Sequence, residues 1–126
     1  MTHFLDTNVC IDILNGLVRK ALPDTIAIST MTSFELFLGV EKCRFSKHER
    51  AKVENFLQTI PVVPFDNNAA KESAKIRATL EQSGRPIGPY DLLIGGHALS
   101  LGLVLVTANM REFSRIPHLS LENWLE

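Results

Sequence analysis

Four polar residues of the chain could do chemistry together if the fold brings them to one place; they are Asp6, Glu35, Asp91 and Asn109. Carboxylates that share a small site repel one another, and a divalent cation bound between them removes that repulsion. Oxygen ligands without histidine or cysteine favour Mg²⁺ or Mn²⁺ over zinc. Such a group is therefore expected to hold a metal ion together with a phosphate and a water nucleophile.

Each of these residues also has an ordinary structural explanation. Asp6 can cap a helix, and Asn109 suits a turn. Thr32-x-x-Glu35 matches a capping box, and the helix dipole favours an acid such as Asp91 in the first turn of a helix. Taken singly, the structural explanation is the stronger one for each residue. Only their joint placement at one edge of a sheet favours a functional site.

The elements that must position these residues alternate between short apolar runs and helical periodicities. Strands are expected at residues 4–5, 25–29, 62–65 and 103–106, with a weaker one at 118–121. Helices are expected from after Asp6 to near Leu17, around residues 34–40, at 46–59 behind the capping box Ser46-x-x-Glu49, from Asp66 or Asn67 to Gly84, and at 89–100. Pro64 places the strand 62–65 at the edge of the sheet.

Strands separated by helices imply right-handed crossovers, and they predict an α/β fold. The expected architecture is a three-layer α/β/α sandwich with a central, mainly parallel twisted sheet of about four to five strands. Ligand sites of such sheets lie beyond the carboxyl ends of the strands. Asp6 ends the first strand, Asn109 follows the strand 103–106, and Glu35 and Asp91 lie near the beginnings of helices. The topology therefore predicts that all four residues meet at one rim.

Length and composition predict a single domain that covers residues 1–126. Hydrophobic residues make up 45% and charged residues 21%, which excludes a disordered chain. The net charge of −1 excludes a protein that holds nucleic acid by bulk charge alone. Cys10 and Cys43 lack a zinc-binding spacing and are expected to be buried and reduced, and His97 is expected to be a packed core residue. No export signal or long apolar span is visible, so a cytoplasmic location is expected.

Four segments of the chain carry a resemblance to a known family. They read Phe-Leu-Asp-Thr-Asn at 4–8, Ser-Phe-Glu-Leu at 33–36, Gly-Arg-Pro-Ile-Gly-Pro-Tyr-Asp at 84–91 and Val-Thr-Ala-Asn-Met-Arg-Glu-Phe at 106–113. In this order, and across the whole chain, they resemble PIN-domain ribonucleases, most nearly the VapC toxins of bacterial toxin–antitoxin pairs. The most specific segment, 85–98, is similar to the VapC branch that cleaves initiator tRNA in its anticodon region. A PIN-like version of the sandwich is thus expected.

The resemblance implies a Mg²⁺-dependent endoribonuclease, with Mn²⁺ as an alternative ion. The acidic metal-site residues of the family match Asp6, Glu35 and Asp91. Asp6 and Asp91 are expected to hold the metal directly or through water, and Glu35 to orient or deprotonate the attacking water. The fourth position of the family, often Asp, matches Asn109 here, which lowers the negative charge of the site; Glu112 is expected to restore it.

Further residues around this site are expected to help in two ways. Thr7, Asn8 and Thr107 are expected to donate hydrogen bonds to the metal-site residues, with helix capping or strand ending as the alternative explanation. Four cations are considered for RNA phosphates: Arg44 and Lys47, from a basic stretch between two helices, and Arg85 and Arg111, which flank the site in sequence. A solvated helix face or a local ion pair explains these cations equally well.

The resemblance also implies protein partners. VapC relatives dimerise and are blocked by a VapB antitoxin, whose tail lies in a groove near the active site. A homodimer and a toxin–antitoxin hetero-oligomer are therefore expected. The apolar residues of the first two helices suit such a groove, although core packing also explains them.

Two other functions fit part of the pattern. A receiver-like phosphoacceptor domain also gathers carboxylates and Mg²⁺ at a parallel-sheet edge, with Asp66 as the acceptor. A receiver-like domain needs a lysine after its last strand, and none follows Val106. This function would also give Glu35 no role. A catalytically silent PIN module would keep the fold for dimerisation and antitoxin binding, and the loss of an acid would indicate it. The nuclease is the stronger hypothesis.

Overall fold

A five-stranded parallel sheet forms the centre of the molecule. The computed structural model describes residues 1–18, 22–23 and 25–124. The strands are β1 (His3–Leu5), β2 (Ile26–Ser29), β3 (Val62–Val63), β4 (Val104–Val106) and β5 (Leu121–Glu122). Their order is β3-β2-β1-β4-β5, and each neighbouring pair runs parallel. The predicted mainly parallel sheet is confirmed.

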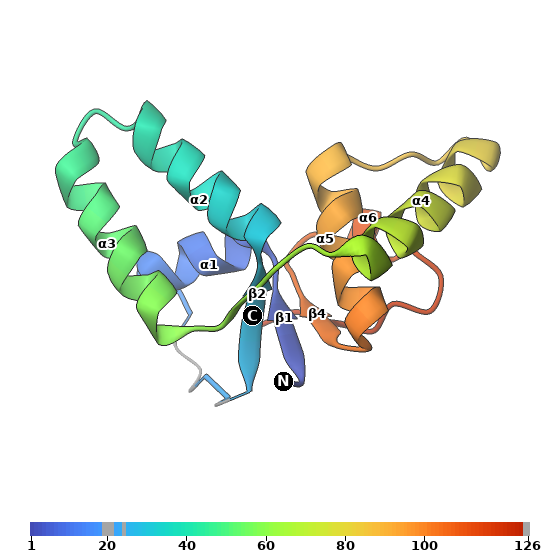
Figure 1. The fold of residues 1–126 in the computed structure, drawn as a ribbon, viewed down its shortest axis with the longest axis horizontal. Helices are drawn as coiled ribbons and strands as arrows, with labels where there is room; N and C mark the ends of the chain where they lie inside the picture. Colours follow the sequence, from blue (N-terminus) through green and yellow to red (C-terminus); the bar gives the residue numbers. More distant parts are fainter. Residues whose placement is uncertain (19–21, 24, 125–126) are drawn as a thin grey trace.

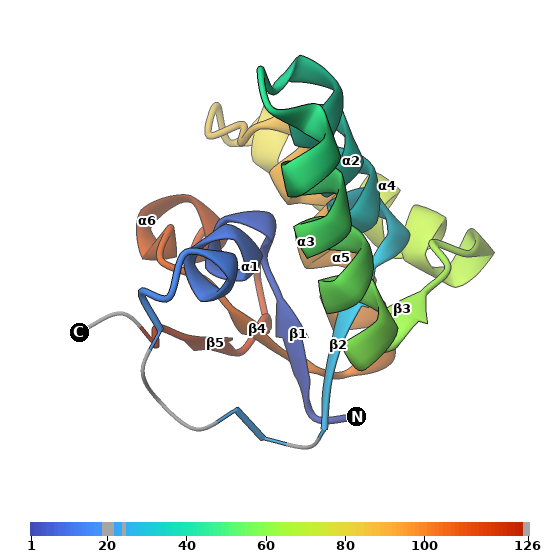
Figure 2. The same cartoon turned by 90° about the vertical axis from the view of Figure 1, so that its left-hand side faces the viewer.

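Helices cover both faces of this sheet. Figure 1 shows one group on one side of the strands and a second group on the other. The first group is α1 (Thr7–Leu14), α2 (Thr30–Lys42) and α3 (Ser46–Thr59); the second is α4 (Asn67–Gln82), α5 (Pro89–Leu101) and α6 (Met110–Phe113). Figure 2 looks onto the face that α1 and α3 cover. This arrangement confirms the three-layer sandwich. No helix within the described residues is long and apolar enough to cross a membrane.

The core consists of two hydrophobic clusters, one on each face of the sheet. Successive strand residues point to opposite faces. Phe4 and Leu105 therefore pack against α4 and α5, whereas their neighbours Leu5 and Val106 pack in a second cluster with α1, α2 and α3. All four side chains are fully buried. The central strands are thus buried on both faces, which explains why they read as continuous apolar runs.

The register of the strands brings their carboxyl ends to one edge. Leu5 of β1 pairs with Val106 of β4. The backbone N–H of Asp6 donates to the carbonyl of Val106 at 2.9 Å, so Asp6 continues this pairing. Helix α1 begins directly after Asp6 at Thr7, and α2 begins directly after β2 at Thr30. The chain therefore turns from strand to helix at this edge in both places.

Two predicted capping boxes are wrong. Helix α3 begins at Ser46 after Phe45, and no side chain caps it, so Ser46 and Glu49 do not form the expected pair. Helix α2 is capped by Ser29, whose Oγ accepts a backbone N–H of the first turn at 3.0 Å. Ser29 has the extended backbone conformation of an N-cap (φ −78°, ψ 152°), whereas Thr32 already lies inside the helix. The Thr32-x-x-Glu35 motif therefore has another role.

Several predicted bounds also differ from the structure. Strand β3 ends at Val63, since the following proline cannot donate to the ladder, although its edge position is confirmed. The last strand is Leu121–Glu122 instead of 118–121, because His118 has a φ of 68°, which breaks the extended conformation. The first helix ends at Leu14, and Leu17 lies exposed beyond it.

Three predicted core residues have different outcomes. Cys10 is buried, as predicted, and it is a free thiol. Cys43 is only partly buried, so the prediction is wrong for this residue, which follows the last turn of α2 as its C-cap. His97 is buried, and its Nδ1 forms a 2.8 Å hydrogen bond with the Oγ of Ser29. Burial lowers the pKa of His97, so the ring is a neutral, hydrogen-bonded core residue, as expected.

Two glycines allow α5 to approach its neighbours closely. A Cβ atom built on Gly96 would lie 2.9 Å from the Cα of Ser73 in α4. A Cβ atom on Gly95 would lie 2.6 Å from the Cδ1 of Ile116. Real side chains essentially never approach this closely, so the α4–α5 packing requires glycine at residue 96.

We expect Gly96→Ala to destabilise the protein by roughly 2 kcal/mol or more, because the new methyl group meets the backbone of α4. Gly39→Ala in α2 is the matched control, since its added Cβ meets no atom within 4 Å. Alanine's higher helix propensity should make that variant more stable by about 0.5–1 kcal/mol. Urea unfolding midpoints measure both effects. A Gly96→Ala midpoint equal to that of the parent would contradict the proposed packing.

Candidate active site

Asp6 stands at the carboxyl end of β1 and is 2% exposed. Its Oδ1 accepts from the backbone N–H of Thr7 at 2.8 Å, so the expected helix cap is present. Its Oδ2 accepts from the hydroxyl of Thr107, which follows β4, also at 2.8 Å. Burial raises the pKa of Asp6 above its usual value, and the charge of Glu35 adds to this, although both hydrogen bonds act in the opposite direction. Asp6 is therefore a cap and also a buried acid.

The side chain of Glu35 is connected to the residue after Asp6 through the hydroxyl group of Thr7. The Oγ1 of Thr7 donates to the Oε1 of Glu35 at 2.6 Å and also forms a 3.2 Å hydrogen bond with the Oγ1 of Thr32. Thr32 is fully buried and lies one helical turn before Glu35, on the same face of α2. The spacing of Thr32 and Glu35 alone predicts a capping box. In the structure the pair joins α2 to α1 through Thr7.

Asn109 links the remaining acids. Its side-chain Nδ2 donates to the Oδ2 of Asp91 at 3.3 Å and to the Oε2 of Glu112 at 2.8 Å. Its backbone N–H donates to the Oγ1 of Thr107 at 2.9 Å, and the same hydroxyl donates to Asp6. Asn109 thus connects α5 and α6 to the residues that follow β4.

The charges of three acids, Asp6, Glu35 and Glu112, act on a fourth, Asp91, which lies in the first turn of α5. Burial is the main cause that raises the pKa of Asp91 to about 6, and the charges of the other three acids raise it further. The hydrogen bond from Asn109 lowers it in part. We refer to these four residues as the acidic cluster.

The chemistry of the donors fits a hard divalent cation. The acidic cluster offers only carboxylate oxygens, supported by hydroxyl and amide groups, without histidine or cysteine. Among the described residues, no three His, Cys, Asp or Glu side chains lie close enough together to hold a metal ion as they stand. Thr7, Thr107 and Asn109 lie between the acids. Mg²⁺ suits such spacing, because it keeps several waters and takes only one or two carboxylates directly.

The other predicted site residues lie at the surface. Asn8 is exposed on α1 and has no hydrogen bond to the acidic cluster among the described residues. Four exposed cations form no ion pair with any described residue: Arg44, Lys47, Arg85 and Arg111. They are therefore accessible to an anionic ligand.

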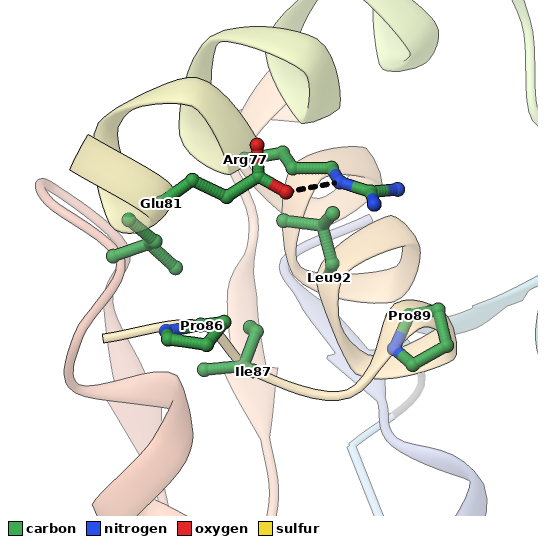
Figure 3. A pocket seen from close by; sticks show the side chains of 7 residues that line it. Arg77, Glu81, Pro86, Ile87, Pro89 and Leu92 are labelled. Atoms are coloured by element: carbon green, nitrogen blue, oxygen red, sulfur yellow. Dashed lines mark hydrogen bonds and ion pairs between the residues drawn. The ribbon is translucent and has the colours of Figure 1, made fainter. Parts of the chain in front are cut away.

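A cavity of about 170 Å³ lies between α4 and the loop that leads into α5 (Figure 3). Ile87 and Leu92 line it together with Arg77 and Glu81 of α4, which form a 3.0 Å ion pair. Arg115 donates from Nη1 to the carbonyl of Pro86 at 2.9 Å and so ties this loop to the segment after α6. The cavity contains no member of the acidic cluster. Its importance for the site is that these contacts hold the loop before Asp91.

The chain resembles proteins of known family over nearly its whole length. The PIN domain model matches residues 3–119. The chain is 41% identical to the tRNA(fMet)-specific endonuclease VapC of Salmonella typhimurium, with 98% of each protein covered. It is 38% identical to ribonuclease VapC2 of Rickettsia felis, again with 98% of each covered.

Solved structures show the same likeness. The VapBC2 complex from Rickettsia felis bound to a promoter DNA fragment contains a chain with a TM-score of 0.88 and 36% identity. That match covers 98% of the present chain and 99% of the other. DNA-bound VapBC from Salmonella typhimurium also has a TM-score of 0.88, with 38% identity and 98% of each chain covered.

We expect Asp91→Asn to stabilise the metal-free protein at neutral pH. The pKa of Asp91 is about 6 in the folded chain against an ordinary value of 3.8, so the folded state binds this proton more tightly. Stability is therefore lost as the pH rises through this window, and the loss is complete above about pH 7. After allowance for solvent screening, the gain should be about 1 kcal/mol at pH 8 and close to zero at pH 3.5.

Thermal unfolding in EDTA between pH 3.5 and pH 8 measures this gain. Glu54→Gln is the control, since Glu54 is exposed on α3 and its carboxylate lies outside the acidic cluster. An Asp91→Asn variant no more stable than the parent at pH 8 would show that the charged carboxylate of Asp91, partly buried and near the other acids, does not destabilise the fold.

Proposed function

This chain belongs to the PIN-domain family, and from that premise we propose that it is a Mg²⁺-dependent endoribonuclease toxin of the VapC type that cleaves initiator tRNA. The observation that carries the proposal is the acidic cluster, whose members come from four different elements and meet at the carboxyl edge of the sheet. The substrate is supported by the similarity to the Salmonella typhimurium endonuclease. We assign the activity to the cytoplasm, where such a substrate is found.

Asp6, Asp91 and Glu35 are the proposed metal-site residues, and Asp6 and Asp91 would hold the ion directly or through water. A Mg²⁺ ion held there would lower the pKa of water and neutralise charge that develops on the phosphate, as would Mn²⁺. Thr107 holds the carboxylate of Asp6 in one orientation through the 2.8 Å bond to its Oδ2. Asn109 does the same for Asp91.

Glu35 is the proposed base. Its Oε1 is fixed by Thr7, and no described residue bonds its Oε2, which is therefore able to orient the attacking water and take its proton. The water oxygen bonds to phosphorus, the bond from phosphorus to the 3′-oxygen breaks, and that oxygen takes up a proton. The products carry 5′-phosphate and 3′-hydroxyl ends.

Glu112 is proposed to replace the charge that Asn109 lacks. The two residues share a 2.8 Å hydrogen bond, and the carboxylate of Glu112 is close enough to raise the pKa of Asp91. The site thus keeps four negative charges, although the residue at 109 is neutral. Thr7 and Thr107 act as positioning residues.

Arg85, Arg111, Arg44 and Lys47 are proposed to contact RNA phosphates. All four are exposed and free of ion pairs in the described part of the chain. Arg44 and Lys47 lie at the turn between α2 and α3, where they would contact RNA away from the acidic cluster. These contacts offset the net charge of −1, which by itself repels RNA.

A VapB-type antitoxin is the proposed inhibitor, and a homodimer is the proposed assembly. The similarity to chains from VapBC complexes supports the partner. A cavity of about 180 Å³ between α1, α2 and α3 has room for an antitoxin segment. Ile11, Leu36 and Glu35 are among the residues that line it. An apolar antitoxin segment bound there would lie beside the proposed base.

The two alternative functions are weaker. The Oδ1 of Asp66 accepts the backbone N–H of Ala69 and caps α4. Asp66 is not among the acids whose charges act on Asp91, so it lies apart from the carboxylates that a receiver-like domain would gather around its acceptor. A silent module is disfavoured because Asp6, Glu35 and Asp91 are all present and lie in one cluster.

We expect Asp6→Asn, Glu35→Gln and Asp91→Asn each to lower the rate of initiator tRNA cleavage by about 100-fold or more, because each removes a charge from the metal site. EDTA should abolish cleavage by the parent. Gel analysis of the purified protein with initiator tRNA, with and without Mg²⁺, measures this, and Glu54→Gln should cleave as the parent does. Undiminished cleavage by Asp91→Asn, or cleavage in EDTA, would sink the metal mechanism. Cleavage of other RNAs alone would refute only the substrate.

Charge compensation at residue 109 has a separate test. Glu112→Gln should raise the Mg²⁺ concentration needed for half-maximal cleavage by roughly ten-fold, because one negative charge is lost. The double variant Asn109→Asp with Glu112→Gln should return it towards the parent value. A Glu112→Gln variant with the parent's Mg²⁺ requirement would show that this carboxylate does not contribute.

A further inference from the structure

Phe34 and Tyr90 form an exposed aromatic pair that joins α2 to α5. Their ring centroids are 5.7 Å apart, and the ring planes are inclined at 40°. Phe34 is 45% exposed and Tyr90 is 43% exposed. Each immediately precedes a member of the acidic cluster, since Glu35 follows Phe34 and Asp91 follows Tyr90.

The position of this pair relative to the acids follows from the two helices. Glu35 and Asp91 are close enough for the charge of one to raise the pKa of the other. The rings of the preceding residues, Phe34 and Tyr90, are in contact. The ring contact and the interaction between Glu35 and Asp91 therefore join the same two helices, α2 and α5. The rings therefore border the acidic cluster on the side where α2 and α5 meet.

Phe34 and Tyr90 bury less apolar surface than core aromatic residues do, so they stabilise the fold less. Other aromatic side chains of the chain, such as Phe4 and Phe113, are fully buried in the core. Large apolar groups that remain at the surface together mark a binding site more often than a structural need. The pair is also separate from the cavity between α1, α2 and α3, whose lining includes neither ring.

We propose that Phe34 and Tyr90 stack an unpaired base of the RNA substrate beside the bond that is cleaved. This inference rests on the proposed ribonuclease function and names how that site holds its substrate. Bases of single-stranded RNA stack on aromatic side chains, and this attraction is independent of charge.

Stacking suits this site because the acidic cluster repels RNA phosphates. The cluster carries several negative charges, and two of the four cations proposed to contact RNA, Arg44 and Lys47, lie at the far end of α2. A neutral aromatic surface attracts a nucleotide without adding to the repulsion of its phosphate. It also selects unpaired RNA, since bases within a duplex stack on one another.

The test uses an RNA hairpin that carries 2-aminopurine in its unpaired loop. The protein carries Asp91→Asn, which removes cleavage, and the measurement is the quenching of 2-aminopurine fluorescence by stacking together with the dissociation constant. We expect Phe34→Leu and Tyr90→Leu each to abolish most of the quenching and to weaken binding about ten-fold. Tyr90→Phe keeps the ring and should restore both. A fully paired duplex with the same probe should show no quenching with any variant.

Phe45→Leu is the matched control, because Phe45 is 72% exposed at the turn between α2 and α3, away from the acidic cluster. It should quench and bind as the Asp91→Asn parent does. In the cleaving protein, Phe34→Leu and Tyr90→Leu should raise KM about ten-fold and leave the Mg²⁺ requirement unchanged. That split separates substrate binding from damage to the metal site.

Unchanged quenching and affinity in both leucine variants would overturn the inference. The same result together with weaker inhibition by a purified VapB-type antitoxin would also overturn it and assign the rings to that protein. These outcomes differ from failure of the proposed function, in which the parent with Mg²⁺ cleaves no RNA.

Discussion

Repulsion between carboxylates is the constraint on which this site depends. The acids are Asp6, Glu35, Asp91 and Glu112. Burial, together with the charges of the other three acids, raises the pKa of Asp91 to about 6. Thr7, Thr107 and Asn109 hold the carboxylates in place with hydrogen bonds of 2.6–3.3 Å. A site of this kind lowers the stability of the folded chain until a cation binds, and the remaining packing must compensate for that loss.

The fold resists this repulsion because each acid is attached to a different element. Asp6 follows β1, Glu35 lies on α2, Asp91 on α5 and Glu112 on α6. The central strands are buried on both faces, so the two hydrophobic clusters hold the backbone segments that carry these acids. The close α4–α5 contact at Gly96 adds rigidity on one side of the sheet. Function and stability are therefore coupled through the core.

Much of the fold was predictable because local periodicity reports burial. The apolar runs at 103–106 and 25–29 correspond to β4 and β2, and Pro64 correctly placed β3 at an edge. Side-chain partners were less predictable. The Thr32-x-x-Glu35 motif satisfies the local rule for a capping box, yet the structure uses both residues to contact Thr7 in α1. A local rule cannot register a competing partner that is distant in the sequence.

Residue types and their order along the chain were enough to show which chemistry is available: acids without metal-binding histidines or cysteines, a nearly neutral chain, and alternating strands and helices that place Asp6 and Asn109 after strands. The packing of whole elements settled that Asp6, Glu35 and Glu112 all act on Asp91, and that Asn109 lies between Asp91 and Glu112. It also decided that Phe34 meets Tyr90. The physical reason is that periodicity depends on neighbours along the chain, whereas proximity between α2, α5 and α6 depends on how whole elements pack across the sheet.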